Sequence, residues 1–290
     1  MESSAEQREA WVQIQLERMW VYYWTNQLHK SMKLVEEMRP RIEQFATPPQ
    51  QTNLFTCLNL MMVRGGRYRV SEEALSLIQN AWMHVQPMEI LNERVSVQFM
   101  LGFNLLWHGD LVEAEQTLQD AYHLAKQIGD VVHQARCITY LTVLYRMQKL
   151  TKTAHEYALE SCTIAETAQM PEYVGASKAN LAWVAWCKKD LIEAEALALT
   201  AMECWQALAL VYPFRWLALW PLLGVALARH QFVPAINYVG ALLDPAQMLM
   251  PDELVALLEE AINAWQARQT ERTATYLHQA VTTAQKLNYL

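Results

Sequence analysis

Residues 110–115 read Asp-Leu-Val-Glu-Ala-Glu, and residues 190–195 read Asp-Leu-Ile-Glu-Ala-Glu. The two stretches are nearly identical and lie 80 residues apart. Midway between them, residues 150–154 read Leu-Thr-Lys-Thr-Ala, which sets the repeat period at 40 residues. Self-similarity at a fixed period of roughly 20 to 50 residues is typical of arrays built from one supersecondary unit. The sequence therefore predicts a repeat protein.

Small residues recur at two fixed places in each repeat. They lie seven residues apart, which is about two helical turns, so both face the same neighbour and let two helix axes approach closely. In four consecutive repeats these residues are Ala74 and Ala81, Ala114 and Ala121, Ala154 and Ser161, and Ala194 and Ala201.

Each repeat is expected to contain two helices. Residues 94–108 carry apolar side chains at helical spacing, and Gly109 then provides a residue that tolerates the left-handed conformation at a helix end. Asp110 and Glu113 have the spacing of a capping box, which predicts that a second helix begins there. Gly129 repeats the stop signal. The pattern predicts an all-α fold of helix pairs.

We count seven such repeats in one domain spanning residues 1–290. The Pro-containing stretches between repeats are short, so we expect them to be inter-repeat loops and not domain linkers. The outer repeats are the least regular, as terminal repeats usually are. The expected units cover residues 10–46, 52–88, 91–129, 131–170, 172–211, 213–244 and 252–290.

The repeat resembles the tetratricopeptide (TPR) family. Its 40-residue period is longer than the family's usual 34 or so. Long repeats with a Gly-Asp joint, as at residues 129–130, are similar to the TPR sensor domains of maltose-regulator-type signalling (STAND) ATPases. This resemblance implies a right-handed superhelical solenoid in which the first helix of each pair lines a concave binding face. The matching residues are Leu101, Gly102, Leu105, Ala114, Leu118 and Ala121.

Composition excludes several classes of function. With 30 acidic against 23 basic residues, the net charge is −7, which argues against nucleic acid as the main partner. The apolar stretch 205–228 is interrupted by Pro213, Arg215 and Pro221, so we expect a buried helix pair and no membrane association. The five cysteines lie singly, which indicates a reducing, cytoplasmic location.

No motif supports catalysis. The sequence contains no phosphate-binding P-loop, no dinucleotide-binding glycine motif and no H-E-x-x-H zinc motif. The eight histidines are scattered, and no two stand at metal-ligand spacing on one helix. We therefore expect neither an enzyme nor a bound metal or cofactor.

Tryptophan is abundant, with eleven in the chain, and the repeat register places many aromatic residues on the first helices of the pairs. Two interpretations stay open: these side chains line a ligand groove, or they fill the space between helices. The residues assigned to the groove are Trp20, Tyr23, Trp24, Phe99, Phe103, Trp107, Tyr140, Arg146, Trp183, Trp186 and Trp220.

A basic turn near residue 65 offers a second, smaller hypothesis. Arg64, Arg67 and Arg69 surround two glycines and could contact an anion or an acidic partner. The alternative is an ordinary solvated turn between two helices.

The leading functional hypothesis is a non-catalytic binding and regulatory module that senses a small organic ligand or a peptide through the aromatic groove. By the resemblance, it would be part of, or a companion to, a larger signalling protein. The alternative is a scaffold that binds a helix or tail of a partner protein and senses no small molecule.

Overall fold

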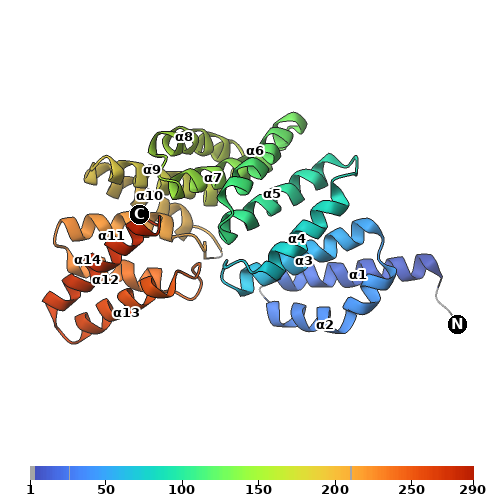
Figure 1. Ribbon diagram of the computed structural model, residues 1–290, viewed down its shortest axis with the longest axis horizontal. Coiled ribbons are helices and arrows are strands. Elements are labelled where there is room, and N and C mark those ends of the chain that lie inside the picture. The colour runs from blue at the N-terminus through green and yellow to red at the C-terminus, as the bar shows by residue number, and fades with distance from the viewer. Residues whose placement is uncertain (1–3, 26, 210) are drawn as a thin grey trace. The chain divides into compact units, whose positions relative to one another are not determined.

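The computed structural model describes residues 4–25, 27–209 and 211–290. Within them it contains fourteen α-helices that pack as sequential pairs (Figure 1). This confirms the predicted all-α fold of about seven helix pairs. The chain folds as two compact units, Met1–Ile128 and Gly129–Leu290. That the repeats form one continuous domain stays a prediction.

The first unit consists of three helix pairs. Helix α1 packs on α3, and the second helices α2 and α4 each pack on the first helix of the pair that follows. The core of the first two pairs is apolar, with Leu16, Met19, Ile42 and Leu54 fully buried. The helices are α1 (Ala5–Trp24), α2 (Leu28–Phe45), α3 (Pro48–Gly65), α4 (Glu72–Val85), α5 (Leu91–His108) and α6 (Leu111–Ile128).

The second unit contains four pairs, and its first helices α7, α9 and α11 pack in a row. The last pair departs from this order, because α14 also packs against α11. The helices are α7 (Val131–Met147), α8 (Thr151–Thr167), α9 (Pro171–Cys187), α10 (Leu191–Gln206), α11 (Trp216–Ala228), α12 (Phe232–Leu242), α13 (Asp252–Gln266) and α14 (Thr270–Lys286).

Several turns between helices use a left-handed residue, as the glycines predict. Gly109, inside the α5–α6 pair, has a φ of 110°, and Gly129, after α6, has a φ of 75°. The same conformation occurs at Lys149, Lys189 and His230, where the sequence has no glycine, so the fold imposes the turn even on residues that adopt it at some cost.

The repeated small residues lie in the core, where they allow close helix packing. All eight are buried. Gly102 serves the same purpose: an added Cβ would lie 2.7 Å from Cγ of Leu118. The pattern that revealed the repeat is therefore a packing pattern.

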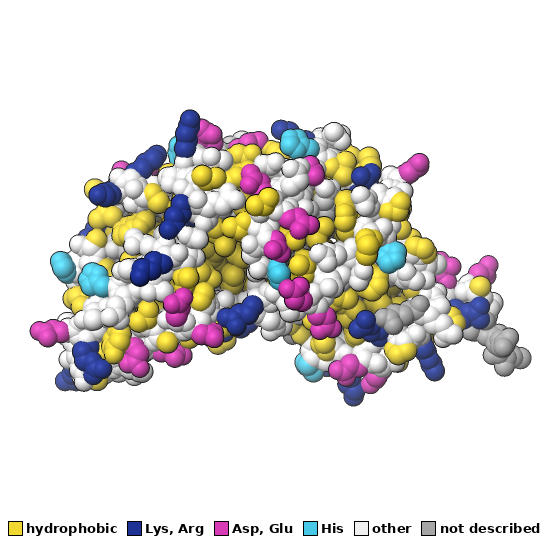
Figure 2. Space-filling view, viewed as in Figure 1, with side chains coloured by type: hydrophobic (Ala, Val, Ile, Leu, Met, Phe, Trp, Pro, Cys, Tyr) yellow, Lys and Arg dark blue, Asp and Glu magenta, His cyan; other side chains and the backbone are white. Residues whose placement is uncertain are grey.

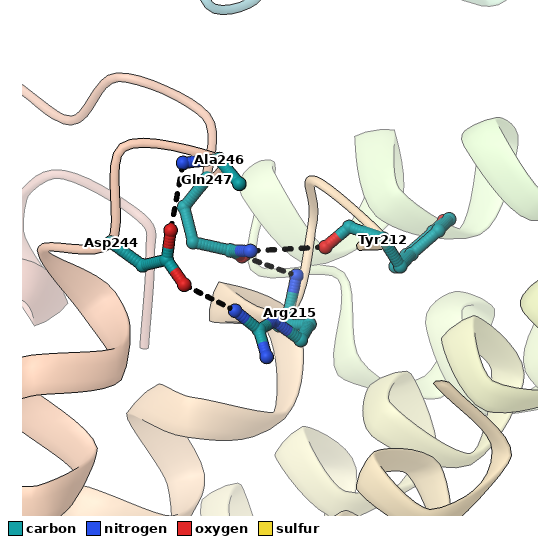
Figure 3. A network of polar contacts seen from close by, with 5 residues as sticks. All are labelled: Tyr212, Arg215, Asp244, Ala246 and Gln247. Carbon is teal, nitrogen blue, oxygen red and sulfur yellow. Dashed lines mark hydrogen bonds and ion pairs between the residues drawn. The ribbon is translucent and has the colours of Figure 1, made fainter. Parts of the chain in front are cut away.

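A polar network fixes the loop before α11 in the second unit (Figure 3). The buried amide of Gln247 donates to the Tyr212 carbonyl (3.1 Å) and accepts from the backbone N–H of Arg215 (3.0 Å). The Arg215 guanidinium pairs with the Asp244 carboxylate at 3.0 Å, and that carboxylate also accepts from the backbone N–H of Ala246. These bonds fix the position at which α11 begins.

No described helix is both long and apolar enough to cross a membrane. The apolar stretch around residues 205–228 is divided instead between the end of α10 and the buried helix α11, in which Trp216, Leu219 and Trp220 are at most 2% exposed.

Candidate functional site

The first unit carries a pocket of about 390 Å³ on the face formed by the first helices of its three pairs. This volume is within the range of small-ligand sites. Helix α1 supplies Gln13 and Trp20 to the lining, and the remaining lining residues are Pro49, Gln50, Thr52, Asn53 and Thr56 from α3 and Glu93, Ser96 and Val97 from α5.

A polar line along α3 explains why the pocket is hydrophilic on one side. Gln50, Asn53 and Thr56 follow one another at steps of three residues, so they share one face of the helix.

Helix α3 begins at Pro48, which suits the first helical turn because an N–H at that position would have no partner within the helix. The Thr47 side chain and Gln50 complete a capping box.

Hydrogen bonds hold two of the lining amides in place. The indole Nε1 of Trp20 donates to Oδ1 of Asn53 at 2.5 Å, which ties α1 to α3. Nε2 of Gln50 donates to the Glu9 carbonyl at 3.1 Å, a second tie between the same helices. The amide groups are thus preorganised by the fold.

The lining also contains a polar atom that the protein does not satisfy. The hydroxyl Oγ1 of Thr56 is buried and has no hydrogen-bond partner among the described residues. Glu93 is the only charged residue of the lining, so the pocket favours a neutral or basic ligand over an acidic one.

Three predicted groove residues form a connected aromatic group beside this pocket. Trp20 stacks on Trp24 with ring centroids 6.3 Å apart, and both rings contact Tyr23. Trp20 and Tyr23 are half-buried, whereas Trp24 is 67% exposed. Arg64 joins the group, since its guanidinium lies 5.2 Å from the Tyr23 ring centroid and donates to the Tyr23 carbonyl.

The other predicted residues of the first unit lie away from the pocket lining. Phe99, Phe103 and Trp107 form a ladder along α5 with centroid spacings of 6.1 and 6.0 Å, and the two end members are buried. Arg67 is half-buried and Arg69 is exposed. The anion contact proposed for the three arginines stays a prediction.

In the second unit, the predicted residues are mostly interior. Arg146 and Trp220 have no exposed surface, and Trp183 and Tyr140 are at most 5% exposed. Trp186 is half-buried, and its ring packs on Gly224, where an added Cβ would lie 2.8 Å from the ring. In this structure, these side chains fill the space between helices.

Arg146 replaces a hydrogen bond that α11 cannot make for itself. Pro221 has no N–H, so the Leu217 carbonyl loses its helical donor. Nη1 of Arg146 donates to this carbonyl at 2.8 Å. Burial without a carboxylate partner lowers the pKa of Arg146 to about 9.

The residues that follow α14 cover Arg146. Nη2 of Arg146 donates to the Tyr289 carbonyl at 2.7 Å, and the Tyr289 ring packs on Trp216 with centroids 4.9 Å apart. Leu290 is 6% exposed. The chain's own residues therefore cover Arg146 and Trp216.

Of the lining residues, the sequence predicted Trp20 but not the polar residues around it. The local signal for the polar side is the three-residue spacing of Gln50, Asn53 and Thr56 on a first helix. The contributions of Gln13, Glu93 and Ser96 could not be found this way, because they depend on the register between helices.

Other described features are weaker candidates. A hollow of about 750 Å³ at residues 109–119 is lined by one turn and one helix start, so it encloses no ligand. Among the described residues, no three His, Cys, Asp or Glu side chains are grouped to hold a metal ion. On the face drawn in Figure 2, the described Lys and Arg side chains lie scattered between polar and hydrophobic ones.

These features give the chain a helical-repeat fold that is TPR-like. It is similar in structure to a STAND protein with a tetratricopeptide repeat sensor from Pyrococcus horikoshii, with a TM-score of 0.57 and 16% identity over 91% of this chain. The match spans only 38% of that protein's length. At this level of identity, the similarity establishes the fold.

Two Rap proteins match this chain over most of their own length. The apo form of RapI matches with a TM-score of 0.57 and 12% identity, over 95% of this chain and 86% of RapI. A Rap protein complexed with Competence and Sporulation Factor matches with a TM-score of 0.56 and 11% identity, over 98% and 99%. No protein-family model and no curated protein matches the sequence.

Proposed function

We propose that this protein is a regulatory module that binds an extended peptide in the first-unit pocket. The observation that carries the proposal is the row of Gln50, Asn53 and Thr56 facing Trp20. Amide and hydroxyl groups at fixed positions suit the alternating carbonyl and N–H groups of a peptide backbone. The Trp20–Trp24 surface offers flat apolar area for a ligand side chain.

Charge and similarity both support a peptide. Glu93 at the pocket wall would attract a basic side chain or a peptide amino terminus. A protein of the same fold was solved as a complex with Competence and Sporulation Factor. Binding would be communicated through the repeats, because each repeat contacts mainly its neighbours.

The test is tryptophan fluorescence of the whole chain during titration with short peptides, oligosaccharides, nucleotides and amino acids, with the melting temperature followed in parallel. A saturable change with neutral or basic peptides, together with a rise in melting temperature, is expected. A response to oligosaccharides or nucleotides but not to peptides would overturn the proposal.

Matched variants tie the signal to the pocket. Asn53→Leu and Thr56→Val should weaken peptide binding at least tenfold, because each removes a polar partner for the backbone. Gln51→Leu changes a neighbouring residue of α3 that is outside the lining and should bind like wild type. Equal affinity in all three variants would place binding elsewhere.

A specific observation favours the scaffold as a second candidate. Ile14, Val21 and Trp24 are 57%, 58% and 67% exposed and share one side of α1. A shallow depression of about 330 Å³ lies along part of this stripe. If the peptide panel gives no signal, this stripe is the surface on which a helix of a partner protein would bind.

A further inference from the structure

The second unit contains a guanidinium that is only partly used. Nη1 of Arg146 is engaged by the Leu217 carbonyl, with the Asn180 side-chain oxygen further away at 3.5 Å. Nη2 donates to the Tyr289 carbonyl, while Nε is buried and has no hydrogen-bond partner among the described residues. The Nε–Nη2 edge of the guanidinium therefore carries at least one N–H donor without an acceptor.

This arrangement is costly for a purely structural residue. A fully buried cation loses its hydration, and among the described residues no carboxylate compensates the charge of Arg146. The faces of Trp183 and Trp216 lie 5.6 and 5.2 Å from the guanidinium carbon. A negatively charged acceptor at this edge would remove both deficits.

The geometry of the missing acceptor follows from the fork. Nε and Nη2 of one guanidinium are parallel donors, and a carboxylate accepts from both at once. One carboxylate oxygen would take the place of the Tyr289 carbonyl, and the second would satisfy Nε. The Tyr289 ring on Trp216 shows that an aromatic group fits next to the acceptor.

We propose that the Nε–Nη2 edge of Arg146 is a binding site for a carboxylate next to an aromatic ring, and that residues 287–290 occupy this site in competition with it. The ligand enters when this short segment leaves α11. The site is independent of the peptide pocket in the first unit, because all of its residues belong to the second.

The probe is the tetrapeptide acetyl-Lys-Leu-Asn-Tyr, which copies residues 286–289 but ends in a free carboxylate at the tyrosine. It is compared with the same peptide ending in a carboxamide, and with phenylacetate as a small-molecule source of the same chemistry. The protein is the full chain carrying Tyr289→Gly and Leu290→Gly, which loosens the covering segment but keeps Arg146.

We expect the carboxylate peptide to bind this variant at least tenfold more tightly than the carboxamide, measured by calorimetry, and to bind the wild-type chain more weakly. Adding Arg146→Lys should abolish the preference, since lysine keeps the charge and loses the fork. The control variant is Arg229→Lys, at an arginine directly after α11 that pairs with Glu195 and is outside the proposed site. This variant should retain the preference for the carboxylate peptide.

The outcomes distinguish a small carboxylate from a peptide terminus as the ligand, and they can overturn the proposal. Saturable binding of phenylacetate with affinity equal to that of the peptide would identify a small carboxylate as the ligand class, and tighter peptide binding would identify a peptide terminus. Equal affinity for carboxylate and carboxamide, or no binding of any probe, would overturn the proposal. This comparison is made on a chain that retains Arg146, so it stands even if the Arg146→Lys chain fails to fold.

Discussion

The two units use the first helices of their pairs in different ways. In the first unit, α1, α3 and α5 leave a polar pocket with a half-buried Trp20 at its wall. In the second unit, α7, α9 and α11 bury most of their aromatic side chains, and residues after α14 cover Arg146. The same repeat pattern thus leaves an aromatic residue beside a pocket in one unit and encloses Trp220 in the other, depending on what packs over it.

The largest expected difference between the units concerns two tryptophans. Trp220→Ala should lower the free energy of unfolding by about 3–5 kcal/mol, because it empties a fully buried site in α11. Trp20→Ala should cost about 1 kcal/mol or less, because the side chain is half-exposed. Urea unfolding followed by circular dichroism measures both. Similar losses would show that Trp20 is also core and break the comparison.

The buried polar contacts between first helices should differ next. Arg146→Met leaves the Leu217 and Tyr289 carbonyls without their donor and should cost about 1–3 kcal/mol. It should also speed hydrogen exchange in residues 285–290. The counterpart in the first unit is the reciprocal pair Asn59 and Asn104.

Asn104→Leu should cost less than Arg146→Met, about 1 kcal/mol, because Asn59 keeps its bond to the Ala74 carbonyl. The unfolding free energies of the two variants decide the order. A larger loss for Asn104→Leu would make the first unit, and not the second, the one that depends on a buried polar contact.

A buried and an exposed glycine of the second unit, Gly224 and Gly240, compare a tightly packed position with an open one. Gly224→Ala would place a Cβ 2.8 Å from the Trp186 ring, which should cost about 1–3 kcal/mol and shift the fluorescence of that indole. Gly240→Ala meets nothing within 4 Å and should stabilise the protein by about 0.5–1 kcal/mol. Thermal melts of both variants provide the measurement. A neutral Gly224→Ala would mean that Trp186 is free to move.

The smallest expected effects are pH-dependent and opposite in sign. The hydrogen bond to Asp110 raises the pKa of His108, so its contribution to stability is present below pH 6.5 and is lost as the pH rises through the folded-state pKa. Burial lowers the pKa of His133, so protonation opposes folding as the pH falls below 6.5.

Unfolding free energies at pH 5 and pH 8 separate the two histidines. Relative to wild type, His108→Gln should be less stable at pH 5 than at pH 8, whereas His133→Gln should gain stability at the lower pH. If both variants change in the same direction, the environments assigned to these side chains are wrong. The His108 effect should be small because this histidine is solvent-screened.

The sequence predicted the fold well because the repeat signals are local. Ala114 and Ala121 mark a contact between helices, and Gly109 marks a helix end. Both signals can be read from a few neighbouring residues. The candidate site was predicted less well. Trp20 was expected on the binding side, but the polar residues that surround it come from three helices whose register no local pattern records.

The repeat period and the helix pairing were determined by the sequence alone. The period follows from similar stretches 40 and 80 residues apart, and the pairing follows from small residues about two helical turns apart. The tertiary structure decided which aromatic side chains remain accessible. Trp20 and Trp220 occupy first helices in the same kind of repeat, yet one borders a pocket and the other is enclosed. The physical reason is that burial depends on the neighbours contributed by distant helices, such as α14 on α11, and these neighbours are not written in the repeat.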